Sequence, residues 1–298
     1  MKISKDGPDL SRIIAGVMTW GVWGENWTAE QAEAYIHQCL ELGVHTFDHA
    51  DKYGHYTTEE LFGKATKGSS ALRQQMKLIS KCGIKLVTPN RPSYKVHSYD
   101  TSKEHILQSV ENSLKNLQTD YLDLLLIHRP SPLMHPQEIA EAFEILKKDG
   151  KVLHFGVSNF TPSQFKMLSK FTELQTNQVE ISLLHRDFLL DGTLDQCIEN
   201  GIAPMAYSTM AKGRFFTDKE DPAVKRIIAV SKDLQEQYNC TYEELLTAWI
   251  LRHPARILPI IGSTKIARMK AAVNATKIEL SRDDWFMLWE AAVGEEVP

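Results

Sequence analysis

The sequence predicts a single-domain α/β protein, a closed (β/α)8 barrel, and three observations support this fold class. Segments typical of strands and helices alternate about eight times along the chain, at roughly 30–40 residues per unit. No linker, low-complexity stretch or break in composition divides the sequence, so one domain is expected over residues 1–298. The G-x-G-x-x-G fingerprint of the competing open, doubly wound sheet is missing, because Gly16, Gly21 and Gly24 have the wrong spacing.

Side-chain caps predict where several helices begin. A capping box pairs a Ser or Thr before the helix with a Glu or Gln three residues later. Such pairs are Thr28 with Gln31, Thr101 with Glu104, Thr161 with Gln164, and Thr241 with Glu244. Pro162 stands at the first position of the third of these helices, and Gly43 ends the first. Apolar spacing predicts further helices at residues 57–67, 136–148, 194–200 and 264–273.

Short apolar runs predict the strands between these helices. The runs cover residues 44–47, 76–80, 122–127, 152–157, 202–206 and 257–261, with a weaker one at 175–181. The leucine-rich run at 122–127 is typical of parallel strands that are buried on both faces of a sheet. Two long loops are expected, at residues 84–100 and 209–222.

The composition is that of a soluble globular protein, with 43% hydrophobic and 24% charged residues. Lys and Arg number 34 and Asp and Glu 38, so no excess of positive charge indicates nucleic acid or a membrane as partner. The N-terminus lacks a signal-peptide pattern, and no apolar run reaches the ~18 residues of a membrane span. The four cysteines form no C-x-x-C pair. We expect a reduced, cytoplasmic protein.

The most informative feature is the residue type at which each apolar run stops. Polar or charged residues follow at once, in chain order Asp48, Lys81, His128, Ser158 with Asn159, Gln178 with Glu180, and Tyr207. The carboxyl ends of the strands in a parallel barrel meet at one face, where active sites of this fold lie. The sequence therefore predicts a functional site built from these side chains.

Tyr53, on the loop after Asp48, is a candidate proton donor beside Lys81 and His128. A free phenol has a pKa of ~10, and a neighbouring ammonium is expected to lower it. Asp48 would then hold Lys81 charged, and His128 would orient the substrate oxygen. The alternative is a structural ion pair between Asp48 and Lys81, with Tyr53 packing the loop.

Six segments, taken together and in this order, resemble the aldo-keto reductase family. They are FDHADKYG (Phe47–Gly54), ISK (Ile79–Lys81), LLLIHRP (Leu124–Pro130), GVSNF (Gly156–Phe160), QVE (Gln178–Glu180) and AYS (Ala206–Ser208). The resemblance covers nearly the whole chain. It implies a TIM barrel that reduces a small-molecule aldehyde or ketone with NADPH, with Tyr53 as the general acid and Asp48, Lys81 and His128 completing the catalytic tetrad. No obligatory protein partner is implied.

The resemblance also implies a cofactor site. Ser158, Asn159 and Gln178 would bind the nicotinamide carboxamide, and Tyr207 would stack on the ring. The remaining cofactor residues would be Thr19, Ser208, Thr209, Met210, Lys212, Gly213 and Arg214, with Ser263, Thr264 and Arg268 at the adenosine phosphate. Where many members have a lysine and an acidic–asparagine pair around that phosphate, this chain has Gly262, Ala271 and Ala272. We therefore expect NADPH over NADH, with a modest preference.

Three aromatic residues are candidates for the substrate pocket: Trp20, Trp23 and Tyr94. Cys82, next to Lys81, is expected to be a small buried hydrophobe rather than a nucleophile. No metal is expected, because His45, His49 and His55 form no H-x-H pair and no H-E-x-x-H motif occurs.

A second function from another class stays open. The same barrel can serve as a regulatory or binding module that senses a nicotinamide cofactor with little turnover, as in the potassium-channel β subunits that resemble this family. A tetrad that is complete in sequence favours catalysis, but a motif alone does not establish turnover.

Overall fold

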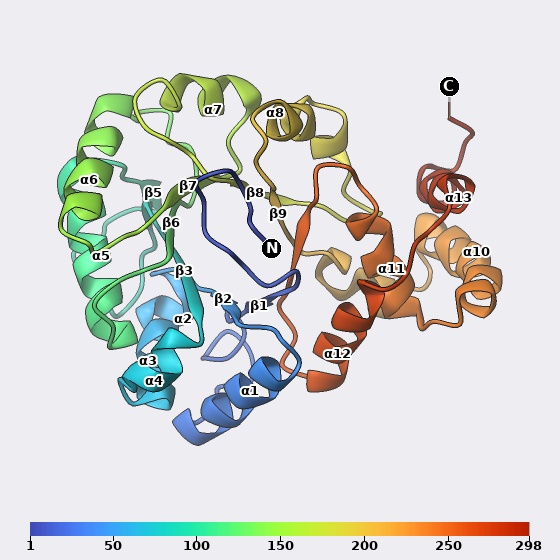
Figure 1. Ribbon diagram of the computed structural model, residues 1–298, viewed down its shortest axis with the longest axis horizontal. Helices are drawn as coiled ribbons and strands as arrows, with labels where there is room; N and C mark the ends of the chain where they lie inside the picture. Colours follow the sequence, from blue (N-terminus) through green and yellow to red (C-terminus); the bar gives the residue numbers. More distant parts are fainter. Residues whose placement is uncertain (298) are drawn as a thin grey trace.

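The structure, a computed structural model, describes residues 1–297 and confirms the closed barrel of parallel strands (Figure 1). The barrel strands are β1 (Ile14–Gly16), β2 (Thr46–Asp48), β3 (Lys77–Cys82), β6 (Leu124–Ile127), β7 (Phe155–Ser158), β8 (Asn177–Glu180), β9 (Met205–Tyr207) and β10 (Leu258–Ile261). They follow the order β1-β10-β9-β8-β7-β6-β3-β2, and the pairing of β1 with β2 closes the cylinder. All their carboxyl ends therefore reach one rim.

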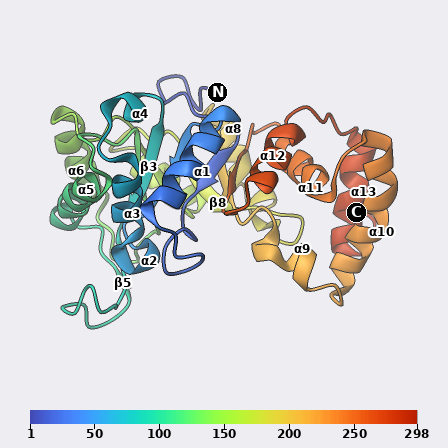
Figure 2. The same ribbon diagram turned by 90° about the horizontal axis from the view of Figure 1, so that it is seen from below.

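Helices surround this barrel (Figure 1). They are α1 (Ala29–Glu41), α2 (Tyr53–Tyr56), α3 (Thr58–Thr66), α4 (Ser70–Gln74), α5 (Lys103–Leu117), α6 (Pro136–Lys148), α7 (Pro162–Leu168), α8 (Thr193–Glu199), α9 (Arg214–Thr217), α10 (Pro222–Tyr238), α11 (Tyr242–Leu251), α12 (Ile266–Ala275) and α13 (Arg282–Val293). Figure 2 shows α10 and α13 packed on each other beside the barrel. Neither of these two helices was expected from the sequence.

Most predicted helix starts are confirmed, and one is wrong. The capping boxes at Thr28, Thr161 and Thr241 are all formed. Helix α5 is instead capped by Ser102, whose hydroxyl accepts from the backbone N–H of His105. The carboxylate of Asp100 binds both the N–H and the hydroxyl of Ser102, which places the cap one residue later than Thr101.

The two predicted loops contain short elements. Within residues 84–100, β4 (Ile84–Lys85) pairs antiparallel with β5 (Ser98–Tyr99), so that the segment between them forms a long hairpin loop. Within residues 209–222, a short 3-10 helix (Ala211–Gly213) leads into α9. Both segments follow barrel strands at the carboxyl rim, where they can border a site.

The core has apolar layers inside and outside the strands. Inside, Ile14, Ile79, Leu124 and Leu258 are completely buried, and they form one cluster with Ile3 of the N-terminal segment. That segment crosses the end of the barrel in Figure 1 and closes it. Because the interior of such a barrel is filled by side chains, a functional site is expected at a rim.

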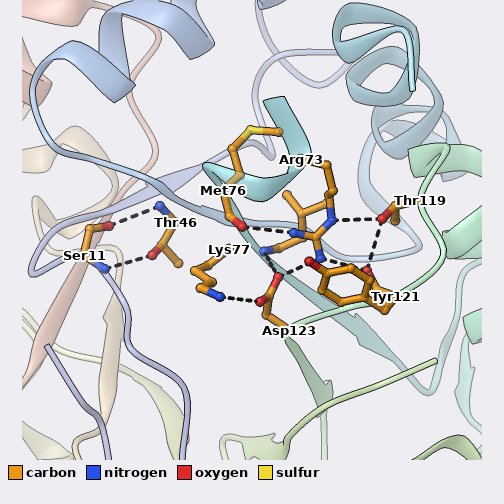
Figure 3. Close-up of polar contacts among 9 residues, drawn as sticks. Ser11, Thr46, Arg73, Met76, Lys77, Thr119, Tyr121 and Asp123 are labelled. Carbon is orange, nitrogen blue, oxygen red and sulfur yellow. Dashed lines mark hydrogen bonds and ion pairs between the residues drawn. The ribbon is translucent and has the colours of Figure 1, made fainter. Parts of the chain in front are cut away.

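An ionic cluster lies at the amino-terminal rim, and Figure 3 shows it. Buried Asp123, just before β6, accepts from Arg73 (2.7 Å), from Lys77 (3.0 Å) and from the backbone N–H of Leu78 (3.0 Å). Arg73 also donates to Thr119. Because these groups satisfy one another, this rim is built for stability, and the functional side chains lie at the opposite end of the strands.

Candidate active site

The carboxyl ends of β2 and β3 and the loop after β2 bring Asp48, Lys81 and Tyr53 together. Lys81 Nζ is completely buried and donates three hydrogen bonds. They go to Asp48 Oδ2 (2.7 Å), to the carbonyl oxygen of His49 (2.7 Å) and to the Tyr53 hydroxyl (3.3 Å). An ammonium has three N–H groups, so the side chain is held in a single orientation.

Asp48 is fixed from two sides. One carboxylate oxygen accepts from Lys81, and the other accepts from Gln178 Nε2 at 2.9 Å, across the barrel on β8. The carboxylate is only 3% exposed, and a buried charge needs such complete pairing. The Gln178 amide oxygen is left free of this contact and remains an acceptor for a ligand N–H.

A left-handed turn presents the Tyr53 hydroxyl to Lys81. Gly54, His55 and Tyr56 have φ angles of 57°, 59° and 69°. A Cβ on Gly54 would lie 2.5 Å from Thr58 Oγ1, so both the backbone angle and the space require glycine here. The D-x-A-x-x-Y-G pattern is therefore explained locally: its glycine allows the turn that aims its tyrosine.

Burial affects the pKa of the Tyr53 phenol more strongly than the charge of Lys81 does. Burial raises the pKa of Tyr53 above its ordinary value, although the charge of Lys81 opposes this. The expectation of a net lowering is therefore wrong for the structure. Burial disfavours the Lys81 ammonium too, but Asp48 and Tyr53 outweigh it, and the pKa of Lys81 is raised. These two shifts favour a neutral Tyr53 phenol beside a protonated Lys81 ammonium.

His128, just after β6, faces the same phenol. Its ring lies edge-on to Tyr53, with centroids 6.0 Å apart. Burial holds the pKa of His128 well below the ordinary value of 6.5, and the charges of Lys81, Arg129 and Lys52 add to this. The imidazole is therefore neutral near pH 7 and can donate one hydrogen bond without carrying charge.

A cleft of about 620 Å³ opens above these side chains and runs toward α12. Of the predicted cofactor residues it is lined by Thr19, Gln178, Tyr207, Ser208, Thr209, Met210, Lys212, Gly213, Ser263 and Arg268. Tyr207 donates to Asn159 Oδ1 (2.8 Å), and Asn159 Nδ2 is 2.7 Å from Ser158 Oγ. Ser158 and Asn159 do not line the cleft themselves, but their hydrogen bonds hold the Tyr207 side chain that does.

Two predicted cofactor residues have other partners. Arg214 points to Asp218 and Asp221 and does not line the cleft. Thr264 is 3.3 Å from a carboxylate oxygen of Glu25 and does not line the cleft. The exposed Arg268 lies over the ring of Phe216, 5.4 Å from its centroid, at the far end of the cleft. The cleft therefore extends from Tyr53 to Arg268.

The predicted pocket residues separate into three environments. Trp20 is fully buried in the core, stacked on Phe62, and does not line the cleft. Trp23 lies 6.2 Å from Tyr53 between ring centroids, beside the candidate acid. Tyr94 packs against Tyr56 and under Lys85 on the long loop. Of the three aromatic residues, Trp23 alone borders the tyrosine.

Sequence reasoning overlooked two cations of the cleft. Lys52 precedes Tyr53 and Arg129 follows His128, and both line the cavity. Arg129 donates to the carbonyl oxygen of His128 and approaches Ser158 and Tyr207. The sequence could have indicated both cations, because each directly adjoins a predicted catalytic residue, Tyr53 or His128.

Within residues 1–297, no group of three or more His, Cys, Asp or Glu side chains is arranged to hold a metal ion. Cys82 is buried, and burial raises its pKa well above the ordinary value, so it is not a nucleophile. Over the same residues, no helix has the length and apolar character that crossing a membrane requires.

Comparison with known proteins gives consistent relatives. A profile of the aldo/keto reductase family matches residues 12–292. Oxidoreductase YdhF of Escherichia coli is 47% identical over 99% of this chain and 98% of its own length. The oxidoreductase YcsN of Bacillus subtilis is 45% identical over 97% and 96%.

Two further matches concern activity and fold. A 6-dehydroglucose reductase of Agrobacterium fabrum is 37% identical, covering 98% of this chain and 97% of the relative. The crystal structure of the thermostable aldo-keto reductase Tm1743, bound to the inhibitor epalrestat, superposes with a TM-score of 0.80 at 25% identity, over 98% of both chains.

Proposed function

Because the chain belongs to the aldo/keto reductase family, we propose that it is an NADPH-dependent carbonyl reductase with Tyr53 as the general acid. The family acts on carbonyl and alcohol groups of small molecules with a nicotinamide cofactor, and the named relatives are oxidoreductases. The proposal adds the cofactor preference, the direction of reduction and the roles of individual side chains.

One observation carries the proposal. The Tyr53 hydroxyl lies 3.3 Å from a lysine ammonium that is itself fixed by a buried carboxylate, and Tyr53 borders the cleft. A structural ion pair would need no phenol beside it. A proton donor needs this arrangement, because an adjacent cation stabilises the phenolate left after transfer.

The cleft residues fit a nicotinamide dinucleotide. The free amide oxygen of Gln178 can accept from the carboxamide, and the Tyr207 ring faces the same space. The loop at residues 208–213 turns through left-handed angles at Ser208, Ala211, Lys212 and Gly213, which aims its backbone at the cleft. When bound, the cofactor of this family supplies a hydride to the carbonyl carbon.

The chain's own residues would handle the proton. Since the pKa of Tyr53 is raised, the phenol stays protonated at neutral pH and can donate to the carbonyl oxygen as negative charge develops there. Lys81 then stabilises the phenolate, and Asp48 keeps Lys81 charged. Neutral His128 would orient the same oxygen by a hydrogen bond. With hydride added to carbon and the proton to oxygen, the product is an alcohol.

Arg268 supports NADPH over NADH. Its guanidinium is exposed at the far end of the cleft and makes no ion pair with a described residue, so it is available to a 2′-phosphate. Gly262 and Ala272 border the same end of the cleft and offer no further charge. The expected preference for NADPH over NADH is therefore modest.

The test follows NADPH oxidation with a panel of aldehydes and ketones, for the native protein and Tyr53→Phe. The phenylalanine keeps the ring but lacks the proton, so kcat should fall by about 10²–10⁴-fold while the Kd for NADPH stays within about threefold. A Tyr53→Phe variant with an undiminished rate would contradict the acid assignment. Tight NADPH binding without turnover on any carbonyl would instead support a cofactor-sensing module.

A further inference from the structure

We propose that Lys52 makes this cleft selective for carbonyl substrates that carry an anionic group. The inference rests on the proposed reductase function and names the substrate class of the same site. Lys52 directly precedes Tyr53 and lines the same cavity, so a substrate whose carbonyl oxygen meets the phenol would extend past the ammonium.

The Lys52 ammonium is held at the cleft rather than free in solvent. Its Nζ lies over the indole of Trp23, 5.5 Å from the ring centroid, and Trp23 itself packs beside Tyr53. A cation over an aromatic face is attracted to it and loses freedom. Lys52 is half-buried, so its charge acts through a medium less polar than bulk water.

No carboxylate among residues 1–297 lies within 4.0 Å of Lys52 or Arg129, the two cations nearest Tyr53 and His128 in sequence. The polar partners of Arg129 are a carbonyl and hydroxyl groups, all uncharged. This end of the cleft therefore holds two positive charges without protein counter-charges.

The acidic residues of the cleft are committed elsewhere. Asp48 is paired with Lys81 at 2.7 Å, and Glu180 is paired with Lys212 at 3.2 Å. Glu243 belongs to α11, which packs on α12 at the opposite, Arg268 end. Asp51, next to Lys52, is buried, and burial raises its pKa well above the ordinary value, so its negative charge is disfavoured.

An anionic substrate would supply the missing charge. Burial lowers the pKa of Lys52, and the charges of Arg129 and Lys81 lower it further, whereas the charge of neighbouring Asp51 opposes this. A carboxylate or phosphate beside Lys52 would accept a charge-assisted hydrogen bond from its ammonium, and the charge of Arg129 would add to the attraction. A neutral substrate of the same shape would leave both cations uncompensated.

The experiment compares matched substrate pairs at fixed NADPH. One pair is para-carboxybenzaldehyde and its neutral methyl ester, and the other is glyceraldehyde phosphate and glyceraldehyde, which separates carboxylate from phosphate recognition. For the native protein we expect kcat/KM to be about tenfold higher for the anion in at least one pair. Lys52→Met should abolish this ratio, and Lys52→Arg should retain it. Lys64→Met, on the exposed surface of α3, is the matched control.

Equal kcat/KM values within both pairs, or a preference that survives Lys52→Met, would overturn the inference while leaving the reductase proposal intact. A second readout does not depend on turnover. Calorimetry with the NADP-saturated protein should detect binding of para-toluate but not of the neutral para-toluamide, and Lys52→Met should lose the difference. This arm decides the inference even if no carbonyl is reduced, and equal binding of the two compounds would refute it.

Discussion

Lys81 is the side chain on which the candidate site depends, because it donates to both the phenol of Tyr53 and the carboxylate of Asp48. Its ammonium is fully buried, and burial by itself would drive off the proton. Asp48, with a smaller contribution from Tyr53, reverses this, so that the pKa of Lys81 ends above the ordinary value. We therefore expect the role of Asp48 to be electrostatic, acting through Lys81.

Asp48→Asn should show how far the charge of Lys81 depends on the Asp48 carboxylate. The amide keeps the shape but removes the charge, so burial again dominates and the pKa of Lys81 should fall. We expect kcat/KM to drop by roughly 10–100-fold and the alkaline limb of its pH profile to move to lower pH. In the native protein this limb should lie at high pH, since the pKa values of Tyr53 and Lys81 are both raised.

Asp51→Asn provides the matched control, because Asp51 is buried nearby but does not touch the Lys81 ammonium. Burial raises the pKa of its carboxyl, which disfavours the negative charge that the amide would remove. An Asp48→Asn profile whose alkaline limb stays in place would show that Asp48 has a purely structural role. If the alkaline limb moved by the same amount in Asp48→Asn and Asp51→Asn, a purely structural role for Asp48 would follow as well.

The sequence placed these side chains at the ends of strands, but it could not give their environment. Strand ends are visible as the points where apolar runs stop, so Asp48, Lys81 and His128 could be predicted together. The bond from Gln178 to Asp48 spans 130 residues and depends on which strands face each other across the barrel. The raised pKa of Tyr53 depends on burial, which no spacing encodes.

The turn after β2 is the element that connects fold to chemistry, because it fixes where the Tyr53 hydroxyl points. Gly54 has a φ of 57° and no room for a side chain beside Thr58. Gly43, at the end of α1, has a φ of 75° as well, but nothing lies within 4 Å of the site of a Cβ. The two glycines share a backbone angle and differ in their surroundings.

Replacing each glycine by alanine separates strain from misplacement of the tyrosine. Gly43→Ala should cost about 1 kcal/mol of stability, because an L residue is strained in the left-handed region, and leave kcat/KM within about twofold. Gly54→Ala adds the contact with Thr58 and should reduce kcat by at least about tenfold, with the Kd for NADPH unchanged. Urea unfolding and steady-state kinetics measure both. Equal kinetics for the two variants would show that the turn does not position Tyr53.

The helices that could be predicted are those whose start is marked by residues close together in the sequence. Three capping boxes marked their helices because the cap and its partner lie three residues apart. The start of α5 was misplaced because Asp100 holds Ser102 through bonds that the box pattern does not describe. Helices α10 and α13 pack on each other outside the repeating unit, so an eight-fold alternation gave no reason to expect them.

The whole barrel divides its polar groups between two rims. At the carboxyl rim, charges are left open to a cleft: Lys52, Arg129 and Arg268 have no carboxylate partner among the described residues. At the amino rim, Asp123 is 1% exposed and neutralised by Arg73 and Lys77 (Figure 3). This division predicts that stability and activity can be perturbed separately.

Asp123→Asn should lower stability without altering catalysis. Removing the charge leaves the largely buried Arg73 guanidinium without its counter-ion, which should cost about 3 kcal/mol in urea unfolding. Asp149→Asn is the matched control, because its contact with Lys151 is exposed and 3.8 Å long, so its loss should change stability by less than about 0.5 kcal/mol. Below the unfolding transition, both variants should keep kcat/KM within about twofold. If Asp123→Asn instead lost activity while remaining as stable as the control, the amino rim would be coupled to the chemistry, and the separation of the two rims would be wrong.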